Sequence, residues 1–221
     1  MSAGLHRIGR EAQPLVVLDG FAADPDGLRE AAMAAGFGPG ANHYPGIRAP
    51  LPEAYLEAQL PVIAEAVRAM GVAGELRVID ASFSIVTTPP AELGVRQRLP
   101  HVDAFAENRI ALVHYLSPEG GDGTAFYRHR STGFETIDES RAPIFFDQLE
   151  AELRMRGMPP AAYIAGDTPL FEQIGHAEAR YNRALLYPSW LLHSGAIAPD
   201  AALSSDPAAG RLTVTGFLVA E

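Results

Sequence analysis

The chain has 221 residues, of which 48% are hydrophobic and 20% charged, a balance typical of a soluble globular protein. Its formal net charge of −10 argues against nucleic acids and anionic membranes as partners, because both select an electropositive face. Cysteine is absent, so disulfides, thiolate catalysis and cysteine-ligated metals are excluded, which leaves histidine and carboxylates as the strong metal ligands. Residues 1–13 lack the apolar core of a signal peptide, and no apolar run is long enough for a membrane span. We therefore expect a soluble, cytoplasmic protein.

The N-terminal third predicts one strand and two helices. Residues 14–19 form an apolar run that predicts a short strand. Asp24 followed by proline is a typical helix start, with the helix ending at Gly36. Residues 36–50 are rich in Gly, Pro and Asn and predict a loop. A second helix is predicted over 52–71, from its apolar spacing and its closing glycine.

From residue 75 onward the pattern changes to short strands. Residues 76–86 are rich in β-branched and aromatic side chains and predict a core strand. A charged helix is predicted at 142–156, and residues 198–210 predict a mobile surface loop. Further strands are predicted at 109–117, 125–129, 177–187 and 212–219. This order indicates a mainly β fold with flanking helices, either a β-sandwich or a jelly roll with helices on one face.

His101 and Asp103 stand two residues apart, at the end of an extended segment that begins near Gln97. In an extended backbone residues i and i+2 point to the same side. The pair therefore presents an imidazole nitrogen and a carboxylate oxygen to one point in space. The same spacing arises by chance in many proteins, so alone it is weak evidence for a metal site.

His193 offers a third ligand, because it follows the apolar strand residues 184–187. By itself such a histidine is more often a satisfied core or surface residue. Together with His101 and Asp103 it completes a face of two histidines and one carboxylate. That set leaves three coordination positions open, the arrangement suited to non-haem Fe(II) oxygenases.

Arg211 stands at the start of an otherwise apolar terminal strand, and Thr213 shares its face by the two-residue period. A guanidinium at a strand edge can pair bidentately with a carboxylate, and a neighbouring hydroxyl adds a further donor. A surface ion pair is the alternative, and without the upstream histidines it would be the preferred interpretation.

The order of these pieces resembles the 2-oxoglutarate/Fe(II)-dependent dioxygenases, nearest their prolyl-4-hydroxylase-like branch. The resemblance runs from about Phe83 to Phe217. It implies that His101, Asp103 and His193 bind Fe(II) and carry catalysis. It also implies that Arg211 and Thr213 hold the distal carboxylate of 2-oxoglutarate, with O₂ as the second co-substrate.

A further segment matches the same branch. His114-Tyr115-Leu116-Ser117, followed by Gly120-Gly121-Asp122-Gly123-Thr124, is similar to its Tyr-Leu-Asn strand and Gly-Gly turn. The match implies that Tyr115 donates its phenol to the distal carboxylate beside Arg211.

The resemblance also implies a fold. We expect one domain over 1–221, a double-stranded β-helix (jelly roll, cupin-like) with an N-terminal helical layer. Residues 1–74 would form the N-terminal strand and helices, and residues 75–221 the core. An insert at about 133–171 is interpreted from its position as a lid or substrate loop.

Several residues are candidates for substrate contact. Arg128, His129 and Arg130 follow the Gly-Gly turn and could meet an acidic substrate group. Trp190 is a candidate wall of the site, although a lone tryptophan is more often core filler. The polar, aromatic loop 42–48 is of the kind that carries binding residues.

Two other histidines are placed outside the site. His114 alternates with Tyr115 along the strand, so it points to the opposite face and is interpreted as a core or interface residue. His176 is interpreted as structural or exposed.

The sequence thus predicts an Fe(II)- and 2-oxoglutarate-dependent dioxygenase that hydroxylates an amino acid, a peptide side chain or a small metabolite. Two alternatives stay open: a cupin-like metalloprotein of another reaction class, and a non-catalytic binding module on the same fold. Nucleic acid and membrane are not expected as partners. The oligomeric state and the substrate are not readable from the sequence.

Overall fold

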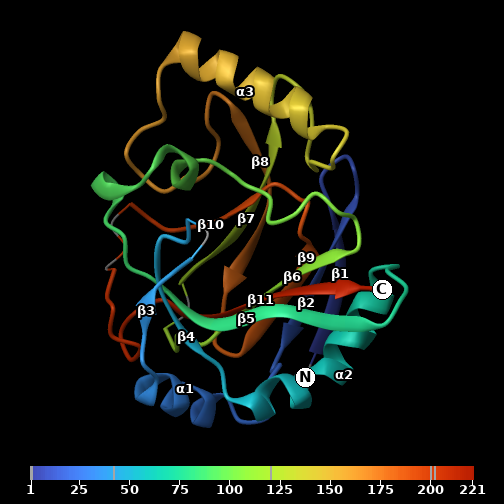
Figure 1. The fold of residues 1–221 in the computed structure, drawn as a ribbon, viewed down its shortest axis with the longest axis vertical. Coiled ribbons are helices and arrows are strands. Elements are labelled where there is room, and N and C mark those ends of the chain that lie inside the picture. Colours follow the sequence, from blue (N-terminus) through green and yellow to red (C-terminus); the bar gives the residue numbers. More distant parts are fainter. Residues whose placement is uncertain (1, 42, 120, 200, 202) are drawn as a thin grey trace.

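The protein is described by a computed structural model that covers residues 2–41, 43–119, 121–199, 201 and 203–221 (Figure 1). Asn42 of the polar loop and Gly120 of the Gly-Gly turn lie outside the described residues. The described chain is mainly β, with two antiparallel sheets and a small number of helices, as expected.

The larger sheet contains eight strands, and every pairing in it is antiparallel. Its strands in spatial order are β1 (Ser2–Ile8), β2 (Gln13–Asp19), β9 (Arg183–Pro188), β6 (Arg109–Tyr115), β11 (Leu212–Ala220), β5 (Leu76–Val86), β4 (Gly46–Pro50) and β3 (Gly38–Pro39). The order places the C-terminal strand β11 between β6 and β5, near the centre of the sheet.

The smaller sheet contains β10 (His193–Gly195), β7 (Gly121–His129) and β8 (Phe171–Ala179), in that order. One apolar cluster joins the two sheets, since Phe126 of β7 packs edge-on against Tyr187 of β9 with ring centres 5.2 Å apart. Tyr115 and Ala111 of β6 belong to the same cluster. The inner face of the large sheet therefore turns its odd-numbered β6 side chains toward the small sheet.

Two helices pack against the other face of the large sheet, α1 (Pro25–Ala34) and α2 (Glu53–Ala69). They lie at the bottom of Figure 1. Asp24 caps α1 by accepting a hydrogen bond from the Gly27 N–H at 2.9 Å. Ala32 of α1 and Ile63 of α2 are fully buried in the cluster that also contains the even-numbered side chains of β6.

The third helix, α3 (Ala142–Arg156), covers the outer face of the small sheet at the top of Figure 1. Phe145 and Leu149 of α3 pack with Tyr127 of β7 and Phe171 of β8. Much of the 133–171 insert is thus a packed layer on this sheet. Two short 3₁₀ helices, Pro90–Glu92 and Val95–Arg98, lead from β5 toward His101.

Two element predictions need correction. The single strand expected at 177–187 is wrong: β8 and β9 are separated by a tight turn in which Asn182 adopts a φ of 59°, a conformation that asparagine tolerates. The loop expected at 36–50 contains β3 and β4, and the polar N-terminus forms a strand, β1, that was not predicted. Periodicity failed for these strands because they bury little apolar surface. Within the described chain, the helices are too short or too polar to cross a membrane.

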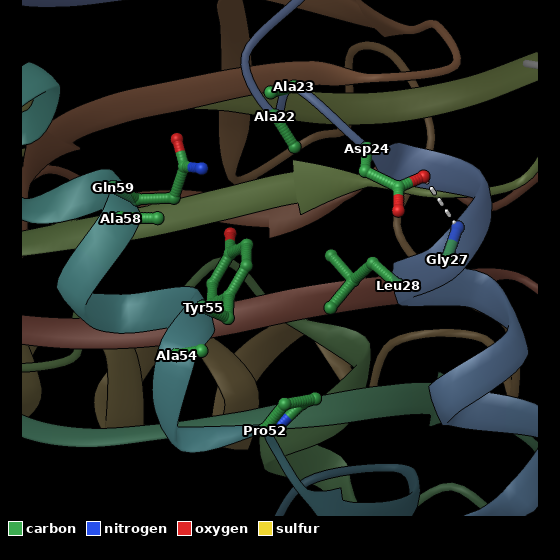
Figure 2. A pocket seen from close by; sticks show the side chains of 10 residues that line it. All are labelled: Ala22, Ala23, Asp24, Gly27, Leu28, Pro52, Ala54, Tyr55, Ala58 and Gln59. Carbon is green, nitrogen blue, oxygen red and sulfur yellow. Dashed lines mark hydrogen bonds between the residues drawn. The ribbon is translucent and has the colours of Figure 1, made fainter.

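A cavity of about 320 Å³ lies between the start of α1 and the start of α2. Figure 2 shows Tyr55 of α2 facing Leu28 of α1 across it.

The buried His114 contacts two polar side chains. The Tyr55 hydroxyl lies 3.0 Å from Nδ1 of His114, and Nε2 of His114 lies 3.0 Å from Oδ1 of Asn182. His114 is fully buried, as expected of a core residue. Its burial lowers its pKa from 6.5 to about 4, while the hydrogen bond that Nε2 donates to the Asn182 amide oxygen opposes that shift.

This histidine should make stability depend on pH. Between pH 6.5 and about 4 the unfolded chain binds a proton at His114 and the folded chain does not. The free energy of unfolding should therefore fall as pH drops through this window, by about 3 kcal/mol in total. Urea unfolding at a series of pH values measures the change. His114→Gln should remove this contribution, whereas the exposed control His176→Gln should keep it; parallel curves for wild type and His114→Gln would contradict the assignment.

Candidate metal centre and co-substrate site

A short backbone pairing brings the two candidate histidines together. The N–H of His101 donates to the carbonyl of His193 at 2.9 Å, and the N–H of His193 returns a bond of the same length. His193 begins β10, which is paired with β7 in the small sheet. The N–H of Asp103 donates to the Ser189 carbonyl at 2.8 Å, so the segment after His101 is also fixed against the chain that precedes β10.

The three side chains of this triad converge. Nε2 of His101 lies 3.7 Å from Oδ1 of Asp103, and Nε2 of His193 lies 3.3 Å from Oδ2. All three ligand atoms fall within 4.8 Å of one another. First-row metal ions bind nitrogen and oxygen at about 2.0–2.2 Å, so two ligands of one ion lie within about 4 Å. The separations between Asp103 and each of the two imidazoles meet this limit, so the donor set fits a single ion.

The tautomer of His193 is fixed by the backbone. Its Nδ1 lies 2.8 Å from the Leu191 carbonyl, which can only accept a hydrogen bond. Nδ1 must then carry the proton, and the Nε2 lone pair faces Asp103 and the centre of the triad. A histidine that binds metal usually has this kind of second contact.

The triad is buried on one side and open on the other. The side chain of His193 is 7% exposed and that of Asp103 16%, whereas 52% of the His101 side chain is accessible. The surrounding protein still disfavours the charged form of His101, and His193 adds to this, so its pKa is lowered although Asp103 opposes the shift. A neutral imidazole is the form that binds metal.

Arg211 lies immediately before β11 with an incomplete set of partners. Its Nη2 donates to the Gly123 carbonyl at 2.8 Å, and its guanidinium carbon lies 5.6 Å from the centre of the Tyr115 ring. Its Nε is buried without a hydrogen-bond partner. Among the described residues no carboxylate forms an ion pair with Arg211. A partly buried guanidinium of this kind is short of an anion.

Tyr115 and Thr213 stand directly opposite each other in the pairing of β6 with β11. The Tyr115 hydroxyl lies 2.7 Å from Oγ1 of Thr124, and burial raises the pKa of this phenol against the nearby charge of Arg211. It is therefore a protonated donor at neutral pH. The Thr213 hydroxyl donates its proton to the Ser84 carbonyl at 3.2 Å, so in this arrangement it does not donate to another acceptor.

Comparisons with known proteins agree with this architecture. HygX from Streptomyces hygroscopicus, solved with nickel and 2-oxoglutarate bound, aligns over 95% of this chain and 84% of its own, with a TM-score of 0.50 and 13% identity. The non-heme alpha-ketoglutarate-dependent epimerase SnoN, from nogalamycin biosynthesis, aligns over 94% and 77% respectively, at a TM-score of 0.46 and 13% identity. At this identity the likeness to HygX speaks for the fold alone. No curated protein matches the sequence.

A family model matches residues 1–218. The chain belongs to DUF6445, a family of unknown function. The match covers both sheets and all three helices, so it takes in the whole triad and the position of Arg211.

Three residues predicted to contact substrate are engaged elsewhere in this DUF6445 chain. Arg128 is buried and paired with Glu135 and Glu172. His129 is fully buried, with Nε2 2.8 Å from Glu152 of α3. Arg130 pairs with Asp167 near the surface. These pairs occupy the charged groups in structural contacts, and we therefore leave all three out of the proposed site.

Trp190 is closer to the triad along the chain, because it follows Ser189, whose carbonyl holds Asp103. Its Nε1 is buried without a partner, as is Oγ of Ser189. One residue that the sequence did not single out also lies here. The ring of Tyr187 is 4.8 Å from that of His193, and burial and the charge of Asp103 raise its pKa. Tyr187 was interpreted only as part of an apolar strand. Tyr44, from the loop 42–48 that the sequence offered as a candidate for binding, lies close enough to Arg211 for the charge of that residue to oppose the rise in pKa that burial gives its phenol.

The triad predicts one strong site for a divalent ion in the DUF6445 chain. Purified protein should bind one equivalent of Fe(II) or Co(II) under anaerobic conditions. His193→Ala should weaken binding by at least about a hundredfold, since even contacts behind a ligand contribute about 10- to 100-fold. Metal titration followed by elemental analysis measures this. His176→Ala, on the exposed side of β8, is the matched control and should bind like wild type; equal loss in both variants would refute the site.

Proposed function

We propose that this protein is an Fe(II)- and 2-oxoglutarate-dependent oxygenase that hydroxylates an amino acid, a peptide side chain or a small metabolite. The observation that carries the proposal is the presence of two incomplete sites, one at the small sheet and one at the inner face of the large sheet that packs against it. One is a triad of His101, Asp103 and His193 with ligand atoms within 4.8 Å of each other. The other is the guanidinium of Arg211, which forms no ion pair with a carboxylate of the described residues and has a buried Nε without a partner among them.

His101, Asp103 and His193 would hold the metal. Two neutral imidazoles and one carboxylate occupy three positions and leave the others free for a chelating co-substrate and O₂, as in non-haem Fe(II) oxygenases. The backbone contact of His193 with Leu191 orients its imidazole before any metal arrives. Asp103 supplies the carboxylate that halogenating relatives lack, so hydroxylation fits the ligand set better than halogenation.

Arg211 and Tyr115 would hold the distal carboxylate of 2-oxoglutarate. The guanidinium can offer a planar pair of donors, and the raised pKa of Tyr115 keeps its hydroxyl available as a further donor. Gly123 makes this arrangement possible, because its carbonyl orients Arg211 and any Cβ there would lie 1.8 Å from the Ala177 carbonyl. When bound, Fe(II) and 2-oxoglutarate together supply the activation of O₂ needed to oxidise a C–H bond.

The walls of the site suit this chemistry. Tyr115, Tyr187 and Phe126 are almost fully buried between the sheets and exclude water from the inner side. His101 leaves the opposite side accessible, where a substrate could approach. The likeness of the fold to that of HygX, which was solved with nickel and 2-oxoglutarate, supports the same interpretation.

Two other functions use parts of the same site. A cupin-like metalloprotein of another reaction class needs the triad but not Arg211, and a binding module needs neither. The unpaired guanidinium favours the oxygenase over both. Conversion of 2-oxoglutarate to succinate with Fe(II) and ascorbate, in the absence of substrate, distinguishes them. Metal binding without succinate formation would favour the first alternative, and iron retention after His101→Ala would favour the second.

Variants at the distal end should affect 2-oxoglutarate rather than metal. Arg211→Gln removes the charged partner of the carboxylate, a loss of about 2–5 kcal/mol, so affinity for 2-oxoglutarate should fall by at least tenfold. Tyr115→Phe removes one hydrogen bond and should cost about 0.5–1.5 kcal/mol. Titration of the visible absorption of the anaerobic Fe(II) complex measures both. Arg77→Gln, whose side chain is 62% exposed, is the control and should match wild type; unchanged affinity in Arg211→Gln would exclude this role.

A further inference from the structure

The inner face of the large sheet carries a polar row at the edge away from the apolar cluster. Successive pairings place Arg48 of β4 opposite Ser84 of β5, and Ser84 opposite Thr213 of β11. Thr213 in turn stands opposite Tyr115 of β6. Directly paired residues share one face of a sheet. Arg48 therefore lies on the same face as Tyr115.

The opposite face confirms this orientation. The neighbours of Arg48 along β4, Ile47 and Ala49, pack with the cluster that α1 and α2 cover. Because side chains alternate along a strand, Arg48 points away from the helices. Its side chain is nevertheless only 17% exposed, so other residues on the inner side of the sheet cover most of it.

Arg48 has few partners for so buried a cation. Its closest carboxylate is Asp80, with Nη1 and Oδ2 3.7 Å apart, beyond hydrogen-bonding distance, and Asp80 is 56% exposed. The guanidinium stacks on Tyr44 at 4.5 Å, and its Nε is buried without a partner. Within the described chain, no hydrogen bond is made by the guanidinium. An unsatisfied buried donor of this kind calls for a ligand or water.

Hydroxyl groups surround the same position. Oγ of Ser84 lies 2.7 Å from Oγ1 of Thr215, and Oγ of Ser82 lies 3.5 Å from Oγ of Ser84. Ser82 and Ser84 are buried. A buried hydroxyl cluster beside an arginine is suited to an oxygen-rich group.

Tyr44 lies near both Arg48 and Arg211. The Arg48 guanidinium stacks on its ring, and the charges of Arg211 and then Arg48 oppose the rise in pKa that burial gives its phenol. The inner face of the large sheet therefore carries two cationic positions, and 2-oxoglutarate has only one distal carboxylate.

Register also relates Arg48 to the triad. Asp80 is opposite Phe217, Phe217 opposite Ala111, and Ala111 opposite Tyr187, whose ring contacts His193. Asp80 and Tyr187 are thus three strand spacings apart, about 14 Å. The Arg48 guanidinium extends toward Asp80, and the Tyr187 ring contacts His193 of the triad. Arg48 and the triad therefore lie at opposite ends of this distance of three strand spacings.

We propose that Arg48 binds an anionic group of the oxidised substrate, so that the substrate is a small acid that reaches from β4 to the metal triad. The hydroxyls of Ser82, Ser84 and Thr215 line the acid-binding end. Asp80 is the internal counter-ion that the substrate's carboxylate displaces. The assignment rests on the proposed oxygenase function and adds a substrate class to it.

Binding to the Ni(II)- and 2-oxoglutarate-loaded protein tests the proposal without turnover. The probes are a panel of amino acids and short hydroxy acids, each matched with its primary amide, which keeps the shape and removes the charge. Ligand-observed NMR should detect acids that bind wild type at least tenfold more tightly than their amides. Arg48→Gln should abolish that preference, and Arg48→Lys should keep part of it, because it retains the charge.

Three controls separate the explanations. Asp80→Asn removes the competing carboxylate, so acids should bind it as tightly as wild type or more tightly. Arg77→Gln should behave like wild type. Affinity for 2-oxoglutarate should change less than twofold in Arg48→Gln, which places Arg48 outside the co-substrate site.

Several results would overturn the assignment. Amides that bind as well as acids, or no acid that binds wild type at millimolar concentration, would exclude an anion position. Equal loss of acid binding in Arg48→Gln and Asp80→Asn would make Arg48 a structural partner of Asp80. Loss of 2-oxoglutarate affinity in Arg48→Gln would assign the residue to the co-substrate. Wild type that binds neither Ni(II) nor 2-oxoglutarate would instead contradict the proposed function itself.

Discussion

The candidate site depends on one reciprocal backbone pairing, between His101 and His193. These residues are far apart in the sequence, and each hydrogen-bonds the other through its N–H and its carbonyl. Their rings are held with centres 4.5 Å apart. Asp103 follows at the two-residue period of an extended chain, and Ser189 fixes its backbone. A metal centre built this way has its ligands positioned by backbone hydrogen bonds to β10 and to the segment before it, which favours a pre-organised geometry.

The sheet register provides the second constraint. It aligns Arg48, Ser84, Thr213 and Tyr115 across four neighbouring strands on the inner face. Gly46 makes the first of these pairings possible, because a Cβ at this position would lie 2.0 Å from the Ile85 carbonyl. The alternation of side chains then divides the strands into a helix-facing apolar surface and an inner surface that is polar toward β4. The same backbone pattern that forms the core therefore also forms this polar inner surface.

The sequence predicted the triad because a two-residue spacing fixes direction in an extended chain, and because the order of motifs resembled a known superfamily. It could not predict how strands would pair. The turn at Asn182 was missed for this reason, as was β4, whose Gly- and Pro-rich segment has no apolar periodicity. Arg128 shows the converse limit: its place after the glycine turn suggested substrate, but Glu135, whose closeness depends on the fold, occupies its charge.

Several buried hydrogen-bond donors near the candidate site have no partner among the described residues, and they affect the stability of the protein. Arg48 and Arg211 each bury an Nε without a partner, and Ser189 and Trp190 beside the triad do the same with a hydroxyl and an indole N–H. A buried donor without a partner costs about 1–3 kcal/mol, and more where the group is charged. A protein with several such donors in one region is less stable without ligand than the same fold would be with these donors hydrogen-bonded. Because a ligand that binds only the folded state raises stability by mass action, occupancy by metal and carboxylates would recover part of that loss. If the proposed carboxylates bind, Arg48 and Arg211 are the residues through which they would raise the stability of this part of the sheet.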